Sequence, residues 1–154
     1  MKNLAVARRY AKALLLISKE DGQTDSYQKE LSGFARLMET DETLNQAVTN
    51  PLYEASVRRN VLQTVIDKLD ISSTVKSFLL LLFDKGRIGF ISAIDDFYKK
   101  LADQLNGIGR ASVISATDLS EETVERIRAA LSKKTNLDIV LQVEKDPELI
   151  GGIV

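Results

Sequence analysis

The apolar positions between Asn3 and Glu20 cover more of a helix than one small core needs. At about 100° per residue they sweep an arc of roughly 200°, whereas a core-facing helix needs only about half of that. The positions are Val6, Ala7, Tyr10, Ala11, Ala13, Leu14 and Ile17, with Leu4 and Leu15 at the margins. Residues 78–83 are apolar on every side of a helix. The two segments predict a helix-sized groove, although ordinary core packing is the commoner explanation of such stripes.

Further helices are predicted over residues 24–105, because apolar residues recur there at helical spacing between short polar breaks. The expected boundaries are a cap at Thr24 or Asp25, a short helix over 43–48 before Asn50-Pro51, a cap at Ser72 or Ser73, and a left-handed stop at Gly86. The expected inward stripes are Tyr27, Leu31, Phe34 and Met38; then Val57, Val61, Val65 and Leu69; and finally Ile91, Ile94, Phe97 or Tyr98, Leu101 and Leu105.

The pattern changes at residues 106–109, where two glycines end the helical succession. Beyond them the sequence predicts a strand over 111–116, a helix capped by Ser120 with Val124, Ile127 and Leu131 inward, and a strand over 137–143. The expected fold is mainly α: a six-helix bundle over 1–105, a linker over 106–109 and a small α/β unit over 110–154. Gly151-Gly152 resembles a turn that opens a further strand, so we expect this unit to lack a C-terminal segment.

Composition narrows the possible functions. Cysteine and histidine are absent, which removes thiolate nucleophiles, the commonest proton shuttle and the commonest metal ligand. Carboxylates, lysine, tyrosine and serine remain, but we expect no enzyme, metal or cofactor. The 21 basic and 22 acidic residues nearly balance, so a nucleic acid is not expected as a partner. No apolar run approaches the roughly 18 residues of a membrane span. We therefore expect a cytoplasmic protein without direct membrane insertion.

Three short motifs favour structural over functional explanations. Arg8-Arg9 with Lys12 could contact phosphate, but a solvated helix face is commoner. Gly107-Ile108-Gly109 lacks the third glycine of a dinucleotide fingerprint and precedes a strand instead of following one. Gly151-Gly152 could form an anion nest, although a turn between sheet segments explains it better.

Four segments coincide in order and spacing with the predicted boundaries. They are residues 7–14, Asn50-Pro51 with Arg58 or Arg59 downstream, residues 78–83 running into Lys85-Gly86-Arg87-Ile88, and residues 146–152. Together they resemble the delta subunit family of bacterial F-type ATP synthase, which is homologous to the mitochondrial oligomycin-sensitivity-conferring protein.

The resemblance implies a non-catalytic stator subunit that links the catalytic alpha/beta head to the peripheral stalk. In the family, the N-terminal helix of an alpha subunit packs between the first and fifth helices. The matching positions here are Tyr10, Ala13, Leu14, Phe78, Leu81 and Leu82. The C-terminal domain would bind the C-terminal ends of the b subunits. The complex would lie at the cytoplasmic face of the bacterial plasma membrane.

One alternative comes from a different class of function. The paired arginines ahead of alanines also resemble the start of RNA-associated helical proteins such as the transcription antitermination factors. Such a protein should bind RNA with a steep salt dependence.

Overall fold

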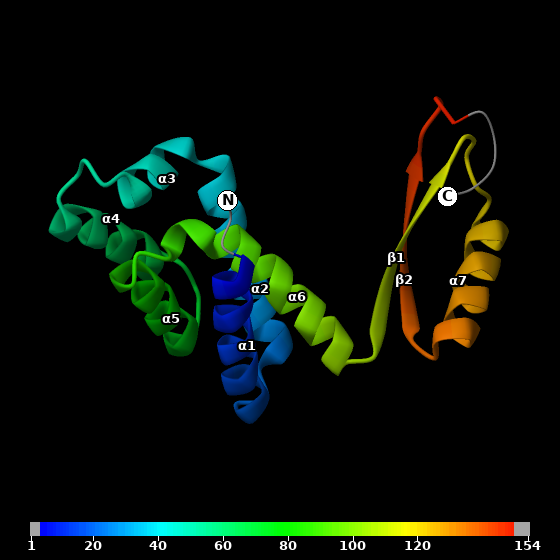
Figure 1. Cartoon of the computed structure of the whole chain (residues 1–154), viewed down its shortest axis with the longest axis horizontal. Helices are drawn as coiled ribbons and strands as arrows, with labels where there is room; N and C mark the ends of the chain where they lie inside the picture. Colours follow the sequence, from blue (N-terminus) through cyan, green and yellow to red (C-terminus); the bar gives the residue numbers. More distant parts are fainter. Residues whose placement is uncertain (1–3, 150–154) are drawn as a thin grey trace. The chain divides into compact units, whose positions relative to one another are not determined.

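The computed structural model describes residues 4–149 and divides into two compact units between Ala102 and Asp103 (Figure 1). The described residues form seven α-helices and one two-stranded sheet. This confirms the predicted mainly α fold with a small α/β unit after six helices. None of the helices within residues 4–149 combines the length and the apolar character that crossing a bilayer requires.

The helical part follows the predicted order of elements. It contains α1 (Leu4–Glu20), α2 (Thr24–Thr40), α3 (Glu42–Thr49), α4 (Ala55–Lys68), α5 (Ser73–Asp84), a 3₁₀ turn η1 (Ile88–Phe90) and α6 (Ile91–Leu105). Two expected boundaries of α5 are confirmed. Ser72 accepts a hydrogen bond from the N–H of Val75, and Gly86 adopts a φ of +65° just after the helix.

The expected cap of α2 at Thr24 or Asp25 is wrong, because Thr24 is already the first helical residue. The preceding residue, Gln23, donates its N–H to the carbonyl of Ser18 at 2.8 Å and so closes the end of α1 after Gly22 at φ +66°. The turn is therefore so tight that α2 starts directly after it without a side-chain cap.

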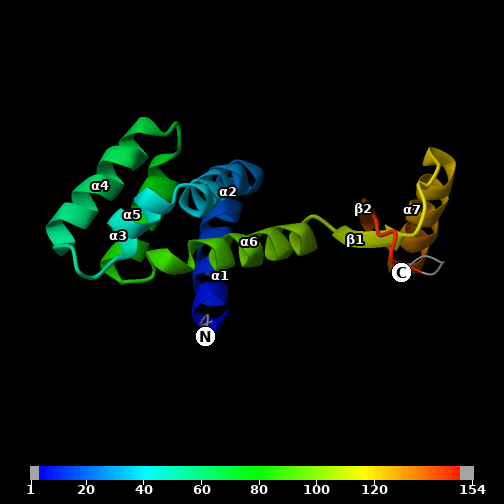
Figure 2. The same ribbon diagram turned by 90° about the horizontal axis from the view of Figure 1, so that it is seen from above.

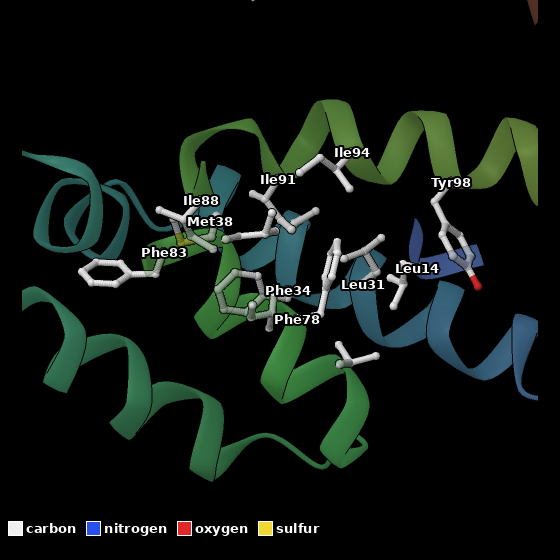
Figure 3. Packing of buried hydrophobic residues seen from close by; sticks show 14 of the residues in the cluster. Leu14, Leu31, Phe34, Met38, Phe78, Phe83, Ile88, Ile91, Ile94 and Tyr98 are labelled. Atoms are coloured by element: carbon white, nitrogen blue, oxygen red, sulfur yellow. The ribbon is translucent and has the colours of Figure 1, made fainter. Parts of the chain in front are cut away.

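All six helices and η1 contribute to the core of the helical unit, and Figure 3 labels core residues from α1, α2, α5, η1 and α6. The predicted stripe of α2 is confirmed, and so is most of the stripe of α6. The buried members are Tyr27, Leu31, Phe34 and Met38 from α2 and Ile91, Ile94 and Tyr98 from α6. Leu105 was expected inside but is 44% exposed, because α6 ends at this residue and Ala102 is the last fully buried residue of the helix.

The predicted stripe of α4 is wrong by one position. Leu62 and Ile66 are fully buried, whereas Val57 is 51% exposed and Val61 and Val65 are only half-buried. A shift of one residue rotates the stripe by about 100° around the helix axis. Apolar residues stand on both neighbouring rows of α4, so the spacing alone does not decide which row faces the core.

The second unit is a strand, a helix and a strand, as predicted. β1 (Ile108–Ser115) pairs in parallel with β2 (Asp138–Lys145), and α7 (Glu121–Thr135) connects them and lies beside the pair (Figures 1 and 2). Ser120 caps α7 by accepting from the N–H of Thr123. The predicted stripe of α7 is only half-buried. The further strand expected after Gly151-Gly152 lies outside the described residues.

The expected linker over 106–109 is shorter than predicted. Gly107 makes the turn at φ +68°, but Ile108 and Gly109 already pair with Asp138 and Ile139 of β2. A Cβ at Gly109 would lie 2.7 Å from Cδ1 of Ile139. This glycine therefore marks a close side-chain approach within the sheet and not a flexible connection.

A candidate partner-binding groove between α1 and α5

One row of α1 is fully buried, and it is built mostly from small side chains. Ala7, Ala11, Leu14 and Ser18 recur every three or four residues and have no solvent exposure. Small residues allow α1 to approach its neighbours closely. Apart from Leu14, the larger apolar residues of α1 stand on the adjacent rows, at the edge of the core or beyond it.

A hollow of about 370 Å³ separates α1 from α5. Leu14 and Ile17 line it from α1, and the α5 side is lined by Ser73, Thr74, Ser77, Phe78 and Leu81. We call this set of residues the α1–α5 groove. Leu14 and Phe78 are buried, whereas Ile17 is 43% and Leu81 44% exposed. The groove thus has a buried apolar floor and two exposed apolar edges.

An aromatic contact joins the two helices beside the groove. The ring centroids of Tyr10 and Phe78 lie 6.3 Å apart with an interplanar angle of 67°. This edge-to-face arrangement directs the positive edge of one ring at the negative face of the other. It holds α1 and α5 at a fixed separation.

The structure brings together four of the six positions that the family resemblance indicates. Leu14, Phe78 and Leu81 line the groove, and Tyr10 contacts Phe78 beside it. Ala13 is exposed on α1 but does not line the hollow, and Leu82 is fully buried in the core. Leu82 is therefore inaccessible to a partner unless the bundle rearranges.

Four lining residues were absent from the sequence-based site: Ile17, Ser73, Thr74 and Ser77. Helical spacing could have found Ile17, which is seven residues after Tyr10 and so on nearly the same row. The same spacing puts Ser73 and Ser77 on the row of Leu81. A search restricted to apolar residues passes over these serines.

Polar contacts hold both walls of the groove. Tyr98 of α6 donates to Oγ of Ser18 at 2.7 Å, which anchors the C-terminal end of α1. Glu30 of α2 accepts from the backbone N–H of Ser72 at 3.0 Å and from its hydroxyl at 2.7 Å, which anchors the start of α5. Burial of the phenol raises the pKa of Tyr98. Both walls of the groove are thus tied to the rest of the helical unit by side-chain hydrogen bonds.

The charged side chains of the described residues are dispersed or joined in single pairs. Within residues 4–149 no three carboxylates gather closely enough to hold a metal ion. The five ion pairs of this part of the chain join one base to one acid each, and three of them have both side chains well exposed. The apolar lining of the α1–α5 groove, in contrast, can bind an apolar surface.

The second unit has a small core and exposed apolar side chains. Its buried side chains among the described residues of the sheet are Val113, Ser115 and Ile139, and α7 has none that is fully buried. Val140 is 45% and Val143 42% exposed on β2. Parallel strands are usually covered on both faces, so this sheet offers a further surface for a partner.

Comparisons of the sequence with a family model and with known proteins agree on one family. Residues 6–154 match the family model described as ATP synthase delta (OSCP) subunit. The ATP synthase subunit delta of Desulfatibacillum aliphaticivorans is 55% identical over 154 residues, which are 100% of this chain and 84% of that protein. The corresponding protein of Desulforapulum autotrophicum is 51% identical over the same shares of both chains.

Two solved structures share the fold. A chain of the mitochondrial ATP synthase hexamer of Toxoplasma gondii matches with a TM-score of 0.68 at 15% identity, over 96% of this chain and 83% of that one. A chain of the Polytomella F-ATP synthase matches with a TM-score of 0.57 at 23% identity, over 62% of this chain and 83% of that one.

Proposed function

The chain belongs to the ATP synthase delta (OSCP) subunit family, and we propose that within the complex it is a non-catalytic stator subunit that keeps the catalytic head from turning with the rotor. The resemblance carried by the four sequence segments is thereby confirmed. The comparisons give no support to the RNA-associated alternative.

The observation that carries this proposal is the α1–α5 groove. Its floor is apolar, and Ile17 and Leu81 leave apolar surface exposed on either edge. Covering the exposed part of each of these side chains would contribute on the order of 1 kcal/mol. An amphipathic helix that lays its apolar face into such a groove is a common mode of recognition. We propose the N-terminal helix of an alpha subunit as the occupant.

A clamp of this kind acts by mechanics and not by chemistry. A rotor can change the conformation of the head only if the head is held still. A preformed groove suits this task, because little conformational entropy is lost when the partner docks. The anchoring of both walls by Tyr98 and Glu30 supports such a rigid role.

For the second unit we propose the C-terminal ends of the b subunits as partners. The exposed Val140, which lies on the face of β2 opposite the buried Ile139, and the small core of this unit support an additional covering surface. The complex would sit at the cytoplasmic face of the bacterial plasma membrane, with this protein attached peripherally.

Titration calorimetry with a synthetic peptide of the alpha-subunit N-terminal helix tests the groove. Ile17→Asp and Leu81→Asp should each weaken binding at least about tenfold, because each puts a charge into the apolar contact. Leu52→Asp is the matched control, because Leu52 is 89% exposed and lies outside the groove. Circular dichroism checks that all three variants fold. Equal affinity of the wild-type chain and both groove variants would refute the proposed docking.

The stalk contact has its own test. Val140→Asp should weaken binding of a soluble fragment that comprises the C-terminal end of a b subunit, whereas Leu52→Asp should not. Loss of binding in both variants, or in neither, would contradict a contact through β2.

A further inference from the structure

The α5 wall of the groove carries hydroxyls that an apolar docking site does not need. Ser73, Thr74 and Ser77 all line the hollow. Ser73 and Ser77 are four residues apart, so they stand one above the other on a single row, with their Cβ atoms about 5–6 Å apart. They form a polar strip along an otherwise apolar groove.

Several hydroxyls elsewhere in the helices are satisfied internally. Five of them donate to a carbonyl three or four residues earlier, at 2.7–2.9 Å: Ser18, Thr40, Thr49, Thr64 and Thr135. Ser73 and Ser77 are exposed, and their hydroxyls make no hydrogen bond within residues 4–149.

Thr74 differs from the two serines. Asp21 raises the pKa of Tyr27 by accepting its phenolic proton, and Thr74 opposes that rise through its own contact with the phenol. Thr74 is thus half-buried next to this phenol of α2, whereas Ser73 and Ser77 are exposed. Ser73 and Ser77 are the pair whose hydrogen-bonding capacity faces the groove.

A docked helix would change the environment of this pair. The two hydroxyls would lose water, and a buried hydroxyl without a partner costs about 1–3 kcal/mol. An occupant with an uninterrupted apolar stripe would incur that cost. An occupant with an acceptor oxygen opposite the pair would avoid it.

Building on the proposed function, we propose that Ser73 and Ser77 set the register of the docked helix and select its sequence. The occupant is an amphipathic helix whose apolar stripe borders one side chain with an acceptor oxygen, an amide or a carboxylate, placed opposite the two serines. A single polar position of this kind fixes register in helix packing because every other register leaves it unpaired. The apolar floor then supplies most of the affinity, and the serine pair the specificity.

Double-mutant cycles between the full chain and the peptide of the alpha-subunit N-terminal helix test this assignment. Ser73→Ala and Ser77→Ala are combined with a peptide series in which each Asn, Gln, Asp or Glu is replaced in turn by Ala. Titration calorimetry should find that Ser77→Ala weakens the unaltered peptide about threefold to tenfold, as expected for one hydrogen bond. This loss of affinity in Ser77→Ala should be absent for one peptide of the series only, the peptide that lacks the acceptor side chain opposite the serines. Ser56→Ala, an exposed serine of α4 away from the groove, should change no affinity.

The outcomes separate the two proposals. If the peptide binds but no position couples to Ser73 or Ser77, the register assignment is overturned and the proposed docking stands. If the unaltered peptide does not bind the wild-type chain, both fall. An equal loss in Ser56→Ala would show a general effect of the substitution and would also overturn the assignment.

Discussion

The hydroxyl of Tyr98 lies 2.7 Å from Oγ of Ser18, and neither side chain has any solvent exposure. The same phenol is 3.1 Å from the carbonyl oxygen of Thr24, so it bridges the end of α1 and the beginning of α2. Ser18 in turn donates to the carbonyl of Leu15 at 2.9 Å. One buried hydroxyl from α6 thereby fixes the helix that forms a wall of the groove.

Tyr98→Phe should lower the free energy of unfolding by about 1–2 kcal/mol, because Ser18 Oγ and the Thr24 carbonyl lose their common donor inside the protein. Urea denaturation measures this difference. Tyr53→Phe is the control, because Tyr53 is 54% exposed and its loss should stay within about 0.5 kcal/mol. Overlapping unfolding curves for the wild-type chain and Tyr98→Phe would contradict a stabilising role of the bridge.

Two tyrosines should make the protein sensitive to alkaline pH. Burial raises the pKa of Tyr98, and the hydrogen bond to Asp21 raises that of Tyr27. In the unfolded chain a tyrosine ionises near about pH 10, whereas the folded chain keeps both phenols neutral to higher pH. Above about pH 10 the unfolded state therefore binds fewer protons, and the free energy of unfolding should fall by at most about 1.4 kcal/mol per pH unit for each tyrosine.

Urea unfolding at a series of pH values between about pH 9 and pH 11 measures that slope. Below about pH 10 these two tyrosines should not make the free energy of unfolding depend on pH. Above about pH 10, the free energy of unfolding should fall less steeply in Tyr98→Phe than in the wild-type chain. The same slope in the wild-type chain and in the variant would show that Tyr98 does not contribute.

The sequence was sufficient to predict which side of a helix is buried where one row of the helix is apolar and the others are polar. α2 has such a row, and its predicted stripe is the observed one. α4 has two adjacent apolar rows, and the periodicity does not distinguish the row of Val61 from that of Leu62. Only packing against the rest of the bundle decides between them, and it buries Leu62.

The same ambiguity limits prediction of the groove. Leu81 and Leu82 are identical neighbours in an all-apolar run, yet Leu81 is 44% exposed and Leu82 is fully buried. Their difference follows from the orientation of α5, which a run without a polar side does not encode. The serines of the groove were not predicted as lining residues for the opposite reason: polar residues near a helix start usually serve as caps, and Ser73 was considered only in that role.

Two glycine substitutions should change stability in opposite directions, each in its own unit. Gly109→Ala would bring a Cβ to 2.7 Å from Cδ1 of the buried Ile139 and should destabilise the second unit by about 1 kcal/mol. Gly33→Ala in α2 meets nothing within 4 Å and should stabilise the helical unit by about 0.5–1 kcal/mol, because alanine loses less backbone entropy in a helix. Native-state hydrogen exchange resolves the two units separately. Unchanged or faster exchange in the helical unit of Gly33→Ala, or unchanged exchange in β1 and β2 of Gly109→Ala, would contradict these effects.

Arg110 and Asp103 form a two-pronged ion pair across the turn before β1. Nε of Arg110 lies 2.5 Å and Nη2 3.0 Å from the two carboxylate oxygens of Asp103, whose side chain is only 11% exposed. Arg110→Ala removes the partner of a nearly buried carboxylate and should destabilise the turn by about 1–2 kcal/mol, less than for a wholly buried pair because the arginine is 57% exposed.

Exchange of the backbone amides of residues 105–110 measures the stability of this turn. Arg110→Lys should show an intermediate effect, because lysine keeps the charge but not the two parallel hydrogen bonds. The double variant Asp103→Asn with Arg110→Ala should exchange more slowly than Arg110→Ala alone, because the carboxylate that has lost its partner is then gone. Arg126→Ala serves as the control, since Arg126 is exposed on α7 and forms no ion pair within residues 4–149. If the double variant exchanged as fast as Arg110→Ala, the cost would come from lost side-chain packing and not from the unpaired charge.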